Sequence, residues 1–175
     1  MALHRRRFLQ ISGALGVLVS VPSVAMLALR GSAPLVDGLQ VLSDHHHRTF
    51  QAMAATHIPK GGAFALGAAD FDLARLFDGY LADQPGSDQR EVKIALNLLE
   101  FGPVLFERHA ATFSNLEPAA QLAHWTAWST SELAVRREIF WSFGKFVGLA
   151  FYDQAQVWPS LGYKGPSYLR MGLPP

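Results

Sequence analysis

The residues with the clearest capacity for chemistry are the run His45-His46-His47 and His57. Imidazole is a common zinc ligand, with metal–nitrogen bonds of about 2.1 Å. Consecutive side chains on a helix point about 100° apart, so three adjacent histidines cannot all bind one metal. His46 and His57 share a helix face but lie roughly 16 Å apart along the axis. The spacing therefore favours a polar helix face over a metal site.

Two acidic pairs have simpler explanations than catalysis. Asp70 and Asp72 flank an expected helix start, where a carboxylate can cap backbone N–H groups. Glu100 and Glu107 are seven residues apart on one expected helix, which is typical of a solvated face. Neither pair predicts an acid–base site.

The sequence contains no recognisable nucleotide-binding or nucleophile motif. Gly61-Gly62 and Gly67 follow no predicted strand, so they do not form a dinucleotide-binding loop. His109 and His124 are isolated, which favours packed or surface roles, and no serine lies in a nucleophile elbow. We therefore predict no catalytic residues, no metal ligands and no cofactor-binding residues on this chain.

Helical periodicity runs through most of the chain after residue 42. Ser43 is the expected N-cap of a first helix that ends near Ile58, because Pro59 disfavours the helical conformation before it. Asp70 is the expected cap of a second helix. The apolar positions of that helix are Leu73, Leu76, Phe77, Tyr80 and Leu81.

Three further helices are expected. Ser87 caps a long one, in which Gly102-Pro103 should cause a kink or a split. Pro118 starts a fourth, with Leu122, Trp125 and Trp128 on its apolar side. The fifth runs from about residue 131 to 153, and its Gly144 and Gly148 would allow close helix approach. The fold class is therefore all-α, a bundle of about five helices followed by an ordered tail rich in aromatic residues, Pro and Gly.

Composition excludes several classes of function. Four of the fifteen Lys and Arg residues, and none of the fourteen Asp and Glu residues, lie in the first 33 residues. The remainder carries eleven basic against fourteen acidic residues, a net charge of −3, which argues against nucleic acid as a partner. Cysteine is absent, which excludes disulfides, covalently attached c-type haem and Cys-ligated iron–sulfur clusters.

The N-terminus has the form of a twin-arginine export signal. Arg5 and Arg6 precede Phe8 and Leu9 in the register of that signal, and an apolar run follows to residue 29. Residues 1–33 are interpreted as signal or anchor and linker, and residues 34–175 as one domain. Ser23-Val24-Ala25 is a small-x-small cleavage sequence, whereas the length of residues 8–29 also permits an uncleaved membrane anchor. The expected location is periplasmic, with the twin-arginine translocase as a partner.

The C-terminal segment combines large amphipathic side chains with backbone-fixing Pro and Gly. Such a composition suits a segment that folds back over its own domain or presses against a partner. The residues that we expect at a partner interface are Tyr152, Trp158, Leu161, Tyr163, Pro166 and Tyr168.

Several short motifs together resemble one family. They are, in order, Trp128-Ser129, Arg136-Arg137, Lys145, Phe151-Tyr152, Val157-Trp158 and Leu161-Gly162-Tyr163-x-Gly165-Pro166, with Ala54-x-x-His57-Ile58-Pro59 upstream. This order resembles the small (gamma) subunit, also called subunit 3, of gluconate 2-dehydrogenase-type membrane-bound flavoprotein dehydrogenases. Phe151 departs from the pattern, since a second Tyr is common there, and so does the triple histidine, where the family has more acidic residues.

The resemblance implies a non-catalytic subunit of an oxidoreductase complex. The large subunit would carry FAD and would be a dehydrogenase of the glucose–methanol–choline type that acts on a sugar or another alcohol. A multihaem cytochrome c subunit could take the electrons. The small subunit would assist folding of the flavoprotein and supply the export signal for the pair.

Two other interpretations remain at this stage. A stand-alone periplasmic module could use its aromatic residues to hold an apolar ligand in a closed pocket. A small metal or hydrolytic enzyme could use His46 or His57.

Overall fold

The computed structural model describes residues 24–62 and 64–166. This part of the chain contains six α-helices, three short 3-10 turns and no strand. The α-helices are α2 (Val24–Arg30), α3 (Asp44–His57), α4 (Leu73–Ala82), α5 (Gly86–Glu107), α6 (Pro118–Ser129) and α7 (Ala134–Tyr152). The 3-10 turns are η1 (Ala68–Asp70), η2 (Phe113–Asn115) and η3 (Trp158–Leu161). The all-α prediction is confirmed, and α3 to α7 correspond to the five helices expected after the leader.

The ends of α3 are those that the sequence predicts. The Ser43 hydroxyl accepts a hydrogen bond from the backbone N–H of His46, and the His46 side chain returns to the Ser43 backbone N–H. This reciprocal arrangement is a capping box in which histidine takes the place of the usual Glu or Gln. The helix ends at His57, and Ile58 is its C-cap, as Pro59 requires.

The start of α4 differs from the prediction. Asp72, not Asp70, is its N-cap and accepts from the Arg75 backbone N–H. Asp70 instead ends the preceding turn, where it accepts from the Gly67 backbone N–H and pairs with Lys60 at 2.6 Å.

The prediction of buried apolar positions on this helix was also wrong at two residues. Leu76 is 48% exposed and Tyr80 is 53% exposed, whereas Asp78 is buried. The Asp78 carboxylate accepts backbone N–H groups from Gln40, Val41 and Leu42 at 2.7–2.9 Å, which fixes the chain before α3. A polar residue thus occupies the buried face because a neighbouring loop needs its acceptor oxygens.

Helix α5 begins at Gly86, one residue before the predicted cap Ser87, and it continues through Pro103 without a split. Proline removes one backbone hydrogen bond and normally costs about 3 kcal/mol inside a helix. Here Gly102 and Pro103 are both buried, so packing of the ring offsets part of that cost. The Pro103 carbonyl still accepts from the His109 backbone N–H beyond the helix end.

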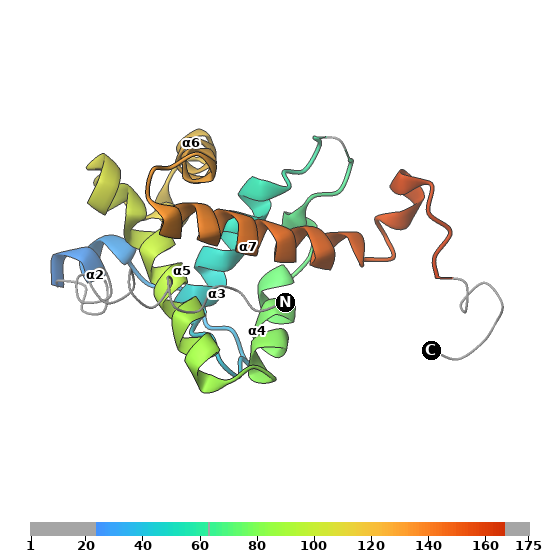
Figure 1. Ribbon diagram of the computed structural model, residues 1–175, viewed down its shortest axis with the longest axis horizontal. Helices are drawn as coiled ribbons and strands as arrows, with labels where there is room; N and C mark the ends of the chain where they lie inside the picture. The colour runs from blue at the N-terminus through green and yellow to red at the C-terminus, as the bar shows by residue number, and fades with distance from the viewer. Residues whose placement is uncertain (1–23, 63, 167–175) are drawn as a thin grey trace.

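The core is built around α3, which packs against α4, α5, α6, α7, η1 and η2. Phe50 is fully buried there and stacks on Phe77 with ring centroids 4.3 Å apart. Phe143 of α7 meets both rings edge-on at 5.7 and 5.9 Å. Figure 1 shows α7 lying across the bundle, with the chain after it extending beyond the other helices.

Helix α6 turns a different side to the core from the one expected. Trp125 and Trp128 are buried as predicted, but Leu122 is 52% exposed and His124 takes the third buried position. The predicted close approach at Gly144 is confirmed, since a Cβ there would lie 2.9 Å from His57 Cε1. The same prediction is wrong for Gly148, which has nothing within 4 Å of its Cβ position.

Candidate partner-binding surface

The chain after α7 forms a small aromatic unit outside the core. Trp158 begins η3, and its indole N–H donates to the Tyr152 carbonyl at 3.0 Å, which ties η3 to the end of α7. The Tyr163 ring meets Trp158 edge-on at 5.4 Å. Gly165 is buried against the indole, where a Cβ would lie 2.9 Å from a ring carbon. We call residues 158–166 the aromatic tail.

The aromatic tail keeps much of its apolar surface in solvent. Leu161 is 43% exposed and Tyr163 is 49% exposed, while Trp158 and Pro166 are half-buried. Of the residues after α7 that the structure describes, only Val157 belongs to the hydrophobic core, with 1% exposure. Figure 1 shows this red segment projecting away from the bundle, so it does not close the core.

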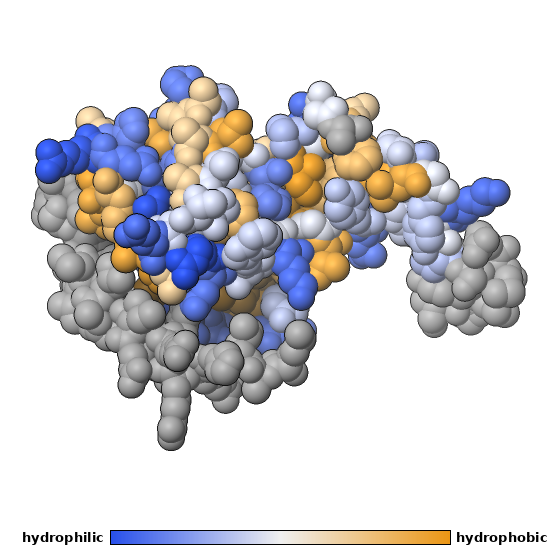
Figure 2. All heavy atoms as spheres, turned by 45° about the horizontal axis from the view of Figure 1, so that its top comes forward, coloured by the Kyte–Doolittle hydropathy of each residue, from blue (hydrophilic) through white to orange (hydrophobic). Residues whose placement is uncertain are grey.

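Helix α7 carries a second exposed apolar surface. Trp141 and Leu149 are each 65% exposed, and Tyr152 is 43% exposed. At 100° per residue these side chains fall on one side of the helix, together with Lys145 and the open Gly148. We call Trp141, Lys145, Gly148, Leu149 and Tyr152 the outer face of α7. Figure 2 shows hydrophobic side chains at the surface near the junction of the bundle and the tail.

The predicted interface residues therefore divide into three groups. The structure places Tyr152, Leu161 and Tyr163 at the surface, and it leaves Trp158 and Pro166 partly covered. Tyr168 lies outside the described residues. The predicted export-signal residues Arg5, Arg6, Phe8 and Leu9 also lie outside them.

Trp141 and Leu149 were not among the interface residues predicted from the sequence. Both lie in a helix that is apolar over much of its circumference. Periodicity alone therefore did not distinguish the side of α7 that faces the core from the side that faces solvent. Their angular position on the helix could have identified them, because Trp141 and Leu149 lie opposite predicted core positions such as Phe143 and Val147.

A buried carboxylate at Glu100 overturns the prediction of a solvated helix face. Glu100 is 0% exposed. It accepts from the Thr49 hydroxyl at 3.0 Å and from the Ser114 hydroxyl at 2.7 Å, and Arg48 Nη2 lies 3.6 Å from its Oε1. Both oxygens are occupied and enclosed, which makes this group a structural anchor between α3, α5 and η2.

A second polar cluster surrounds Glu107, one heptad further along α5. Its carboxylate contacts His124 Nδ1 at 2.7 Å and Arg136 Nη2 at 3.6 Å. The Arg136 guanidinium lies over the rings of Phe106 at 4.8 Å and Trp128 at 5.1 Å, a cation–π arrangement.

The geometry at His124 does not favour proton transfer to a substrate. His124 is 1% exposed, and its Nε2 lies 2.8 Å from the position that a Cβ on Gly102 would take. Burial lowers the pKa of His124, against the opposing effect of Glu107. This histidine is therefore packed, as the sequence analysis favoured.

The triple histidine is neither a metal cluster nor a fully solvated face. His47 pairs with Asp72 at 2.7 Å, and His46 Nε2 lies 3.3 Å from Asn97 Oδ1. Burial, with a contribution from Arg30, lowers the pKa of His46 to about 4. Within the described ranges no group of three or more His, Cys, Asp or Glu residues could hold a metal ion.

One hollow lies beside the His47–Asp72 pair. It has a volume of about 280 Å³ and is lined by His47, Gln51, Ala69, Asp70, Phe71 and Asp72. This volume is at or below the lower end of the range of about 300–1,000 Å³ for small-molecule sites. The hollow is open to solvent and four of its six lining residues are polar or charged, which differs from the closed apolar pocket that a stand-alone ligand-binding module would need.

Comparisons with known proteins return no relative. No protein-family model, no curated protein and no solved structure matches the chain. Among the helices that the structure describes, none is long and apolar enough to cross a membrane. The resemblance to the dehydrogenase small subunit, which rests on short motifs, stays a prediction.

Proposed function

We propose that this chain is a non-catalytic small subunit, of the gluconate 2-dehydrogenase subunit 3 type, in a periplasmic or membrane-bound dehydrogenase complex. Its partner is an FAD-dependent subunit of the glucose–methanol–choline type that oxidises a sugar or another alcohol. A multihaem cytochrome c subunit is a further proposed member. The chain assists folding of the flavoprotein and carries the twin-arginine signal for export of the pair to the periplasm.

The exposed outer face of α7, continued by the aromatic tail, is the observation that carries this proposal. Trp141 and Leu149 each leave about two thirds of their surface in solvent. Large exposed apolar residues grouped on one side are typical of interaction sites, and Trp and Tyr are common among residues that dominate binding energy. A protein that worked alone would gain solubility by replacing them with polar residues.

The charge distribution agrees with a protein partner. Lys145 and Glu138 are the charged residues on this exposed side of α7, and Lys164 lies in the aromatic tail. The domain as a whole is slightly acidic. A mostly apolar surface with few charges is the composition of the buried core of a stable protein–protein interface.

The motifs of the resemblance fall partly on this surface. Tyr152, Leu161 and Tyr163 are motif residues and are exposed, whereas the motif residue Arg136 is packed on Trp128 inside the domain. The motif set thus contains both residues that maintain the fold and residues available to a partner.

The test is affinity purification of the tagged full-length chain from its native membrane and periplasmic fractions. We expect a flavoprotein to co-purify and to give the eluate a flavin absorbance spectrum. Haem bands would add the cytochrome subunit. A colourless, stable monomer in the eluate would contradict the proposal.

Two matched variants test whether the outer face of α7 is the surface that binds the flavoprotein. Leu149→Asp places a charge on the outer face of α7, and we expect it to lower flavoprotein recovery about tenfold or more, because an interface core does not tolerate an unpaired charge. Leu122→Asp changes a similarly exposed leucine on α6 and should leave recovery unchanged. Equal recovery with both variants would exclude the outer face as the binding surface.

A further inference from the structure

The segment that joins the apolar leader to the bundle is bound by side chains of the bundle. Arg48 donates to the Ser32 carbonyl at 2.7 Å and to the Arg30 carbonyl at 2.6 Å. Asn115 donates to the carbonyls of Leu29 and Arg30, each at 3.1 Å. These four hydrogen bonds hold a stretch that, by sequence, ends the leader and begins the linker.

The two donors form one binding site only in the folded domain. Arg48 lies on α3, where its guanidinium is near the buried Glu100 carboxylate at 3.6 Å. Asn115 lies in η2, and its side-chain amide also donates to Thr112 Oγ1 at 3.0 Å, so that its two N–H groups are shared among three acceptors. Because α3 and η2 are distant in sequence and pack together only after folding, the site depends on the tertiary structure.

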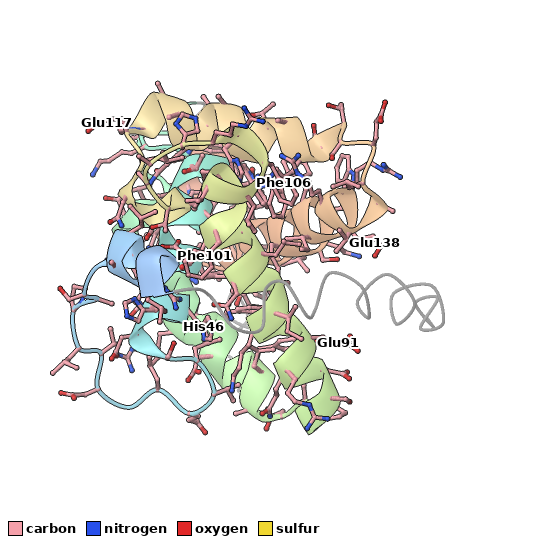
Figure 3. The ribbon with its side chains drawn as sticks, turned by 90° about the vertical axis from the view of Figure 1, so that its left-hand side faces the viewer. His46, Glu91, Phe101, Phe106, Glu117 and Glu138 are labelled. Carbon is pink, nitrogen blue, oxygen red and sulfur yellow. The ribbon has the colours of Figure 1, made fainter. Side chains whose placement is uncertain are left out.

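The side chain of Arg30 is part of the same contact. Arg30 is 8% exposed, and its guanidinium lies 5.6 Å from the centroid of the Phe101 ring. Figure 3 shows α2 beside Phe101, against α5. Burial lowers the pKa of Arg30, and the nearby negative charge of Glu100 opposes this effect. A cation that merely flanked a removable leader would remain in water.

The chain after Arg30 is also fixed to the bundle at intervals. The Val36 backbone N–H donates to Asp44 at 2.9 Å, and the Asp37 carbonyl accepts from Arg75 at 2.9 Å. The Asp78 carboxylate then holds residues 40–42. Residues 29–42 therefore follow the surface of the bundle and do not form a free linker.

We propose that Leu29–Ser32 is a permanent part of the folded domain, so that proteolytic removal of the leader stops before Leu29. Signal-peptidase cleavage hydrolyses one peptide bond with one water, and the sequence Ser23-Val24-Ala25 supplies a position that leaves these contacts intact. The domain thus begins several residues before the boundary at residue 33 that the sequence indicated.

The first experiment determines the N-terminus of the exported protein. The full-length chain is expressed with its own leader, recovered separately from periplasm and membrane, and its N-terminus is mapped by mass spectrometry. We expect every N-terminus at or before Leu29. An N-terminus at Gly31 or later would overturn the proposal. This experiment rests on the proposed export, and recovery in the cytoplasm alone would count against export and not against the docked segment.

The second experiment is independent of export and of any partner. The full-length chain is treated briefly with trypsin, and cleavage at the Arg30–Gly31 bond is quantified by mass spectrometry. We expect this bond to be protected, and Asn115→Ala to raise its cleavage rate about tenfold, since two hydrogen bonds of roughly 1 kcal/mol each restrain local opening. Arg90→Ala, at an exposed position on α5, is the control and should leave the rate unchanged.

The Asn115 side chain is at the surface, so its truncation should leave the helices intact, and far-UV circular dichroism checks this. Arg48→Ala removes the other donor and should act in the same direction. Equal cleavage after Arg30 in the wild type, Asn115→Ala and Arg48→Ala would overturn the proposal.

Discussion

The bundle and the aromatic tail differ in which side chains they bury. In the bundle even charged or titratable groups such as Glu100, Asp78 and His124 are buried, each with polar partners. In the tail even Leu161 and Tyr163 remain in solvent. These buried carboxylates are paired inside the bundle, whereas the apolar side chains of the tail are left in solvent. Under the proposed function, the exposed apolar surface is where the partner binds.

The largest expected effect on stability comes from a buried charge in the bundle. Glu100→Gln removes the negative charge beside Arg48 and Arg30 while keeping the side-chain shape. We expect a loss of about 3 kcal/mol in the free energy of unfolding, because breaking a buried ion pair leaves the partner uncompensated. Chemical denaturation measures this loss. Glu138→Gln, on the exposed side of α7, is the control, and equal stability of the two variants would show that Glu100 is not an anchor.

Packing on α7 can be tested with two glycines four residues apart. Gly144→Ala places a Cβ 2.9 Å from His57 Cε1, and we expect a loss of about 2 kcal/mol through overpacking. Gly148→Ala meets nothing within 4 Å and should gain roughly 0.5–1 kcal/mol, since alanine favours helix. Thermal or chemical denaturation of both variants decides this. A gain in both would mean that α7 does not press on α3 at Gly144.

The pH dependence of stability follows from His46. Its pKa is about 4 in the folded state, below the ordinary value of 6.5, so the unfolded state binds the proton more readily. The stability that this group contributes is complete above pH 6.5 and is lost as pH falls from 6.5 through 4. Discounted for partial exposure, the loss at pH 5 is roughly 1–2 kcal/mol.

His46→Gln is the variant for this measurement. Glutamine at this position can keep the capping box with Ser43 but does not titrate. Denaturation at a series of pH values should show a shallower fall between pH 6.5 and 4 than in the wild type. His109→Gln, at an exposed position, is the control. The same slope in all three proteins would refute the assignment of this acid sensitivity to His46.

The smallest expected effect on stability is in the tail. Tyr163→Ser should change the free energy of unfolding of the bundle by less than about 0.5 kcal/mol, as is usual for surface substitutions. Under the proposed function it should nevertheless lower recovery of the flavoprotein partner. A large loss of stability would instead place Tyr163 in the fold of the domain.

The sequence predicted best those features that depend on neighbours along the chain. Ser43 and Pro59 bound α3 as expected, because capping and the restriction before proline act over a few residues. Pro118 likewise begins α6. Local sequence did not decide between two nearby aspartates that could each cap α4, and the cap is Asp72, not Asp70.

The features that the sequence did not predict depend on distant partners. Glu100 looked solvated because its hydrogen-bond donors, Thr49 and Ser114, come from other parts of the chain. Pro103 looked disruptive because its burial could not be seen locally. The exposed outer face of α7 could be separated from its core face only once the register of Phe143 and Val147 was fixed.

The central position of α3 has a consequence for when the protein can fold. Residues 44–57 are synthesised well before α7, residues 134–152, which is one of their packing partners. Phe50 therefore has no complete cover until α7 has left the ribosome. The core of such a domain is expected to form only after α7 has been synthesised, because its nonlocal contacts form late. A nascent chain with an uncovered α3 is the species that a cell's chaperones would meet.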